Sequence, residues 1–203
     1  MQNELNPKKH FCLYERASRK KCFTAHTVQR NTHSIDSLLN LWAPVLLVSL
    51  VIGMSSPLAI PLPFSPIPIA LQPHLVLIFA ALLGSKKGCI ATAGFLLQGI
   101  LGLPVFACGS TGLIHLFGPR GGYLIGYVIA AFITGWIIEK KENKVFYALV
   151  IGNIIIYLCG GLQLFSFLSL QQVFYIGILP FLLGDFVKII FFTKIYYFLK
   201  KYI

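Results

Sequence analysis

The chain has 203 residues, of which 57% are apolar and 11% charged, and its formal net charge is +11. A mean hydropathy of +0.79 is hard to reconcile with a soluble core, and apolar blocks between short polar breaks are typical of a polytopic membrane protein. The basic residues cluster in the N-terminal segment and in loops, which favours membrane orientation over nucleic-acid binding. Five cysteines without a CxxC pair predict neither a disulfide framework nor a metal site.

The N-terminal segment, residues 1–36, is polar, with seven Lys/Arg, three acids and no apolar core of the kind that signal peptides contain. We expect a disordered basic tail over 1–36 and a six-helix membrane domain over 37–203. The predicted spans are about Leu38–Met54, His74–Leu83, Cys89–Leu101, Tyr123–Ile138, Val145–Phe165, and a sixth that starts near Tyr175–Ile178 and ends near Leu199.

Three connections between these spans are distinctive. The first holds six prolines between Pro57 and Pro73 and cannot be an ordinary helix, so we expect an apolar loop that lies on the membrane surface or caps a cavity. GSKKG (84–88) is expected to be a tight basic turn. Gly102–Gly122 is a long glycine-rich loop, and glycines at 118, 122 and 126 predict close helix packing.

An even number of spans places both termini on one side of the membrane. The tail and the lysines at 86, 87, 140, 141, 144, 194, 200 and 201 then fall on that side, and Arg120 alone falls on the other. By the positive-inside rule the basic side is cytoplasmic. The sequence thus predicts an all-α polytopic protein of the cytoplasmic (inner) membrane, a compact bundle with cytoplasmic termini and an external pocket.

The sixth span contains two charges, Asp185 and Lys188, within an apolar run. Each costs roughly 2.5–3.5 kcal/mol at mid-membrane on insertion scales, so such residues usually face the bundle interior or a wet cavity. Their i, i+3 spacing puts them on one helix face, where they can pair or jointly hold a ligand. The alternative is a structural ion pair that only holds helices together.

The sequence lacks the common motifs of enzymes. GxxxxGK[ST], HExxH and GxSxG do not occur, so we expect neither ATP hydrolysis nor an intramembrane hydrolase, and we assign no catalytic residue. A small bundle with a deep polar site suits capture of a partly apolar small molecule with hydrogen-bonding ends.

Several ordered motifs resemble the BioY family, the biotin-binding S components of energy-coupling-factor (ECF) vitamin transporters. They are PIPIALQ (66–72), GLPVFACGSTGL (102–113), GPRGGYLIGY (118–127), the Asn153 region and PFLLGDFVK (180–188). The similarity runs from about residue 38 to the C-terminus and leaves the tail outside. The family usually has threonine where this chain has Ala70 and Arg120, which removes a hydroxyl and adds a cation at the pocket mouth.

This resemblance implies biotin as the transported ligand and no cofactor. The implied partners are membrane lipid, an ECF transmembrane coupling subunit and two ABC-type ATPase subunits. Action of the chain alone or as a homo-oligomer stays open. Asp185 would accept the ureido N–H groups, and Lys188 or Arg120 would meet the valerate or the ureido oxygen. The remaining assignments are Asn153 at the ureido edge, further hydrogen bonds from Gln72 and Tyr123, an apolar wall from Phe106, and a tight turn or close backbone approach at Gly109.

Simpler interpretations stand beside these. Asn153 could merely tie two helices, Tyr123 could anchor at the interface, and Gln98 is expected to make an interhelical hydrogen bond. His74 and His115 are interpreted as loop residues, not metal ligands or proton relays. The alternative functions are an S component for another vitamin or a biotin precursor such as dethiobiotin, and a structural or assembly membrane protein.

Overall fold

The computed structural model of the chain describes residues 42–61, 63 and 67–202. The predicted basic tail, residues 1–36, lies outside the described residues. The chain divides into two units, Met1–Pro44 and Val45–Ile203, and the fold and cavity below belong to the second.

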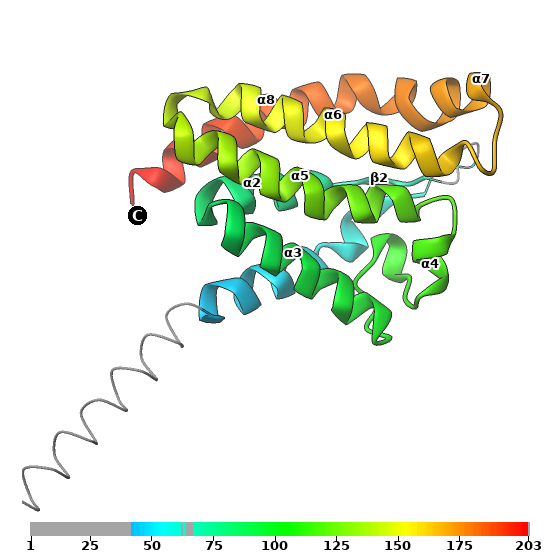
Figure 1. Cartoon of the computed structure of the whole chain (residues 1–203), viewed down its shortest axis with the longest axis horizontal. Helices are drawn as coiled ribbons and strands as arrows, with labels where there is room; N and C mark the ends of the chain where they lie inside the picture. Colours follow the sequence, from blue (N-terminus) through cyan, green and yellow to red (C-terminus); the bar gives the residue numbers. More distant parts are fainter. Residues whose placement is uncertain (1–41, 62, 64–66, 203) are drawn as a thin grey trace, which may run out of the picture. The chain divides into compact units, whose positions relative to one another are not determined.

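Helices dominate the described part of the chain (Figure 1). The first is described over Trp42–Met54. The elements that follow are η1 (Ser56–Leu58), β1 (Ala59–Ile60), β2 (Ile69–Ala70), α2 (Gln72–Leu83), α3 (Ser85–Ile100), η2 (Ala107–Gly109), α4 (Ile114–Phe117), α5 (Gly121–Lys140), η3 (Glu142–Lys144), α6 (Val145–Leu164), α7 (Leu170–Gln172), the π-helical η4 (Val173–Ile178) and α8 (Leu179–Lys200).

Among the described residues, three helical segments are long and apolar enough to cross a membrane: Gly121–Lys140, Glu142–Leu164 and Val173–Lys200. Twenty helical residues extend about 30 Å, the thickness of the hydrocarbon layer. Trp42–Met54 and α2 are apolar but shorter, and α3 has 16 residues. The structure thus has the helical character and apolar segments of a membrane protein, and the number of spans stays a prediction.

The described residues of the proline-rich connection, 55–61, 63 and 67–71, are not helical beyond its first turn, as its prolines predict. Its described ends form an antiparallel hairpin in which Ala59 pairs with Ala70 and Ile60 with Ile69. The second strand leads directly into α2, whose second residue is Pro73. Proline is tolerated there because the first amides of a helix have no intrahelical acceptor.

The expected turn over GSKKG is wrong in its extent. Gly84 alone breaks the chain, with φ +86°, and α3 begins at Ser85, so both lysines lie in its first turn. The carboxylate of Glu139 explains this start, because it accepts the backbone amide of Ser85 at 2.7 Å and also its hydroxyl. An acidic group at a helix N-terminus is favourable. Glu139 lies near the end of α5, so the sequence around Ser85 could not indicate this contact.

Close packing joins α5 to α6, which run side by side in Figure 1. A Cβ at Gly122 would meet the backbone carbonyl of Cys159, and a Cβ at Gly126 would lie 3.2 Å from the Cα of Ile156. The predicted role of these glycines in helix packing is confirmed. Gln98, likewise, donates to Ser49 at 2.8 Å, the expected interhelical hydrogen bond.

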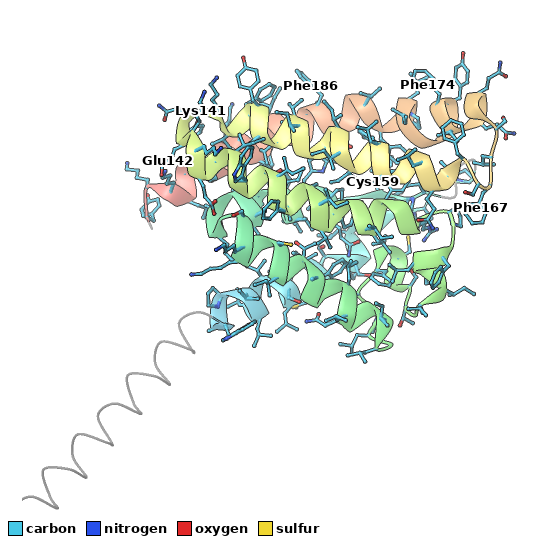
Figure 2. The ribbon with its side chains drawn as sticks, in the orientation of Figure 1. Lys141, Glu142, Cys159, Phe167, Phe174 and Phe186 are labelled. Atoms are coloured by element: carbon cyan, nitrogen blue, oxygen red, sulfur yellow. The ribbon has the colours of Figure 1, made fainter. Side chains whose placement is uncertain are left out.

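Polar contacts join the helix ends at one end of the unit. Glu142 pairs with Lys200 at 2.5 Å, and Tyr197 donates to the carbonyl of Asn143. Figure 2 shows Lys141 and Glu142 at this end, whereas Phe167 and Phe174 lie toward the other. The ends of α5 and α8 and the start of α3 therefore share one polar rim, which the Ser85–Glu139 contact also joins.

Candidate ligand-binding site

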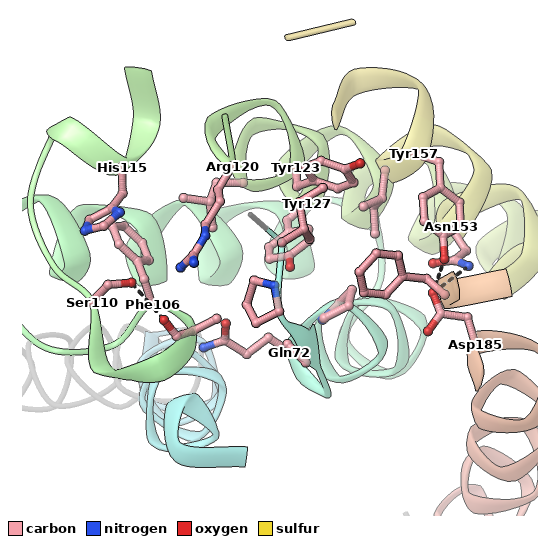
Figure 3. A pocket seen from close by; sticks show the side chains of 18 of the residues that line it. Gln72, Phe106, Ser110, His115, Arg120, Tyr123, Tyr127, Asn153, Tyr157 and Asp185 are labelled. Carbon is pink, nitrogen blue, oxygen red and sulfur yellow. Dashed lines mark hydrogen bonds between the residues drawn. The ribbon is translucent and has the colours of Figure 1, made fainter. Parts of the chain in front are cut away.

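A cavity of about 730 Å³, its open mouth included, lies between the hairpin, the 102–122 loop, α5, α6 and α8 (Figure 3). Seven of the eight predicted site residues line it: Gln72, Phe106, Arg120, Tyr123, Asn153, Asp185 and Lys188. The eighth, Gly109, is not among the lining residues; its φ is +69° and its amide donates to Ser56 at 2.9 Å.

Asp185 is 6% exposed and is held from two helices. Its Oδ2 accepts the hydroxyl of Tyr157 and the amide of Asn153, the latter at 3.4 Å. Its Oδ1 accepts the ammonium of Lys188 at 3.0 Å, so the pairing expected from the i, i+3 spacing is confirmed. Lys188 also donates to the carbonyl of Ala70 at 3.3 Å, which joins α8 to the hairpin.

Asn153 has one satisfied end and one open end. Its Nδ2 donates to Asp185, which links α6 to α8, as the simpler interpretation proposed. Its Oδ1 is buried and has no hydrogen-bond partner among the described residues. A buried acceptor left unsatisfied costs about 1–3 kcal/mol. Because Asn153 also lines the cavity, a ligand N–H group could remove that cost.

The other half of the cavity carries a cation. Figure 3 shows Arg120 on the side of Phe106 and His115, away from Asp185, with its guanidinium directed toward the middle of the cavity. Arg120 precedes the first residue of α5. The turn before it is fixed by Gln163 on α6, whose amide donates to the carbonyls of Leu116 at 2.9 Å and Gly118 at 2.8 Å.

Among the described residues that line the cavity, the formally charged side chains are Arg120, Lys188 and Asp185. Two cations beside one anion in a low-dielectric site favour a ligand that carries a negative charge.

Three predicted residues shape the site, two by hydrogen bonds to backbone carbonyls and one by packing. The amide of Gln72 donates to the carbonyls of Val105 at 2.6 Å and Ile52 at 3.4 Å, which holds the start of the 102–122 loop. Phe106 is 2% exposed and packs edge-on against Phe95, so it is both core and cavity wall. Tyr123 is buried and donates to the carbonyl of Gly177 in η4, so the interpretation of an interfacial anchor is wrong.

Sequence reasoning missed Tyr157 and misread His74. Tyr157 follows Asn153 by four residues, and that i, i+4 spacing could have placed both on the face toward Asp185. His74 is not a loop residue but a buried residue of α2, 3.9 Å from Asp185 Oδ1. His115 lies in α4 and lines the cavity. The described residues contain no cluster of three metal-ligating side chains.

These features define a helical membrane protein with a mostly apolar cavity, hydrogen-bond acceptors at one end and a cation toward the other. Comparison with known proteins gives the family. The BioY family model matches residues 26–203, starting earlier than the motifs indicated. The chain is 39% identical to the biotin transporter BioY of Thermotoga maritima, over 70% of this chain and 86% of that protein. It is 38% identical to the probable biotin transporter BioY of Pyrococcus horikoshii, over 71% and 88%.

A solved structure is also similar. It is the crystal structure of the S component for biotin from an ECF-type ABC transporter, with a TM-score of 0.72 and 26% identity over 82% of this chain and 93% of that one. The chain belongs to the BioY family.

Proposed function

We propose that this chain is a membrane subunit that binds biotin and mediates its uptake, and that it is a transporter component, not an enzyme. The observation that carries the proposal is the polarity of the cavity. Asp185 and the open acceptor of Asn153 lie at one end, and Arg120 lies on the other side. Biotin has the complementary order, with ureido N–H donors, an apolar thioether ring and an anionic valerate chain.

In the proposed pose the ureido ring enters between α6 and α8. One ureido N–H donates to the Asp185 carboxylate and the other to Asn153 Oδ1, since charge-assisted hydrogen bonds are the stronger kind. Lys188 lies beside them and can donate to the ureido oxygen. The fused ring packs against Phe106 and neighbouring apolar groups.

The valerate carboxylate then extends toward Arg120. Its negative charge is attracted by the Arg120 guanidinium, which lines the cavity. Arg120 occupies a position where the family usually has threonine, so this contact would be particular to chains with a cation there.

We extend the proposal to the topology: six spans, both termini cytoplasmic, in the cytoplasmic (inner) membrane. The ends of α5 and α8 and the start of α3 share one rim, and lysines at 86, 87, 140, 141, 144, 200 and 201 lie at or near these ends. The positive-inside rule makes this rim cytoplasmic. The hairpin and the 102–122 loop border the cavity, so they would face outward.

The partners that we propose are an ECF transmembrane coupling subunit and two ABC-type ATPase subunits. The solved neighbour is an S component from an ECF-type ABC transporter, and this sequence has no ATP-binding motif of its own. Biotin would be the cargo and no resident cofactor is needed. A homo-oligomer in the lipid membrane is an alternative to the full complex.

Titration of the detergent-solubilised protein with biotin, biotin methyl ester and dethiobiotin tests the proposal. We expect saturable one-site binding, tightest for biotin and weaker for the uncharged ester. Tighter binding of dethiobiotin or of another vitamin in a competition panel would reassign the ligand. A protein that folds and binds none of them would return the Asp185–Lys188 pair to a purely structural role.

A further inference from the structure

His74 is a buried polar residue that the proposed pose does not use. It is 1% exposed, and neither ring nitrogen has a hydrogen-bond partner among the described residues. Its ring stacks on Phe192 of α8, with centroids 5.9 Å apart and planes at 18°. Burying an imidazole without partners is unfavourable, so this residue requires an explanation.

A charged group, Asp185, lies close to the His74 ring. His74 Nε2 lies 3.9 Å from Asp185 Oδ1, about 1 Å beyond hydrogen-bond distance. The same oxygen accepts Lys188 at 3.0 Å, whereas Oδ2 already has Tyr157 and Asn153. Oδ1 is therefore the carboxylate oxygen with capacity for a further donor.

The two donors that face Oδ1 differ in access to the ligand. Lys188 lines the cavity and its side chain is 22% exposed, whereas His74 does not line it and its side chain is 2% exposed. A ligand that attracts the ammonium draws it away from Oδ1. The buried carboxylate would then lose part of its compensation, which is strongly unfavourable in the interior.

We propose that His74 is a positioning residue for the ligand site: its Nε2–H donates to Asp185 Oδ1 when the ligand engages Lys188. The carboxylate then keeps its charge and orientation while Lys188 is shared with the ligand. His74 lies beside Asp185 and is not among the residues that line the cavity, so it fulfils this role without occupying ligand space. The inference depends on the proposed function, since it concerns the same site.

Two substitutions separate this role from simple packing. His74→Phe keeps an aromatic ring against Phe192 and removes the donor, and His74→Gln restores a donor of similar reach. A hydrogen bond to a charged group corresponds to roughly a 10- to 150-fold change in an equilibrium constant. We therefore expect biotin to bind His74→Phe at least tenfold more weakly than wild type and His74→Gln within about threefold.

The melting temperature of each ligand-free variant is measured beside the affinity. Removing unsatisfied nitrogens should leave the melting temperature of His74→Phe unchanged or higher, so a loss of affinity would not reflect unfolding. An affinity of His74→Phe equal to wild type overturns the inference and leaves biotin binding intact. Equal losses in both variants, with lowered melting temperatures, also overturn it. A wild-type protein that does not bind biotin overturns both proposals.

A measurement on the wild-type chain covers the case in which His74→Phe does not fold. In protein labelled with ¹⁵N-histidine, the His74 resonances are identified by their loss in His74→Gln. Saturation with biotin should shift the Nε2 resonance as its N–H begins to donate. An Nε2 resonance that stays in place at saturation contradicts the inference.

Discussion

Asp185→Asn keeps the shape of the side chain and removes its charge, so it measures what the carboxylate contributes. At 3.0 Å, the attraction between Asp185 and Lys188 is about 5–6 kcal/mol for an effective dielectric constant near 20. Lys188 retains the carbonyl of Ala70 and some hydration through the cavity. We therefore expect the free energy of unfolding of the ligand-free protein to fall by about 3 kcal/mol, the lower end of the range for a broken buried pair.

The same variant should lose ligand affinity. A charge-assisted hydrogen bond to the ureido group contributes about 1.5–3 kcal/mol, so the Kd for biotin should rise roughly 10- to 150-fold. Calorimetric titration gives the Kd, and a thermal melt without ligand gives the change in stability. These two readouts are independent, because the melt is recorded on the empty protein.

Glu142→Gln is the matched control at the opposite, polar rim. Glu142 is also a carboxylate paired with a lysine, at 2.5 Å, but its side chain is 68% exposed. A surface pair contributes at most about 1 kcal/mol, so this variant should bind biotin as wild type does. If Asp185→Asn melted earlier but bound biotin within threefold of wild type, the pair would be structural and the proposed pose would be wrong.

Four further variants, one of them a control, test the rest of the site and its surroundings. Arg120→Thr should weaken the binding of biotin roughly tenfold and leave the binding of the methyl ester unaffected, because only the biotin carboxylate presents a charge to Arg120. Equal losses of affinity for both ligands in titrations would contradict this prediction. Gly122→Leu should lower the melting temperature, since overpacking against Cys159 costs about 1–3 kcal/mol or more. Gly184→Ala should not, because a Cβ at that position meets open space. Gln163→Ala should cost about 1–3 kcal/mol in the melt, and an unchanged melting temperature would show that its two hydrogen bonds do not hold the turn.

Sequence patterns predicted most of the helices because their apolar runs are long and their breaks are marked by charge, proline or glycine. The boundaries of α5, at Gly121 and Lys140, differ from the expected Tyr123 and Ile138 by two residues each. The start of α3 could not be predicted, because Glu139 is 54 residues away from Ser85 in the chain. Contacts of that range have no local signal.

The residues of the site likewise fall into those that the sequence could identify and those that it could not. Asp185 and Lys188 were identifiable because charge within an apolar span is costly unless it is paired or functional. Tyr157 has no such signal, since it carries no charge, and His74 stands at the predicted start of the second span, where it was interpreted as a loop residue. What makes them notable is their contact with Asp185 from α6 and from α2, which only the tertiary structure shows.

The helices α5 and α6, which line the cavity, and the hairpin and the 102–122 loop, which border it, are held in place by different kinds of contact. Between α5 and α6, glycines bring the backbones so close that side chains would clash, and such packing resists separation. The hairpin and the 102–122 loop are joined instead by individual polar contacts, such as Lys188 to Ala70, Gln72 to Val105 and Gly109 to Ser56. Each of these contacts is individually modest in net energy, about 0.5–3 kcal/mol. Lys188 also pairs with Asp185, so one side chain contacts both the carboxylate of the site and the hairpin.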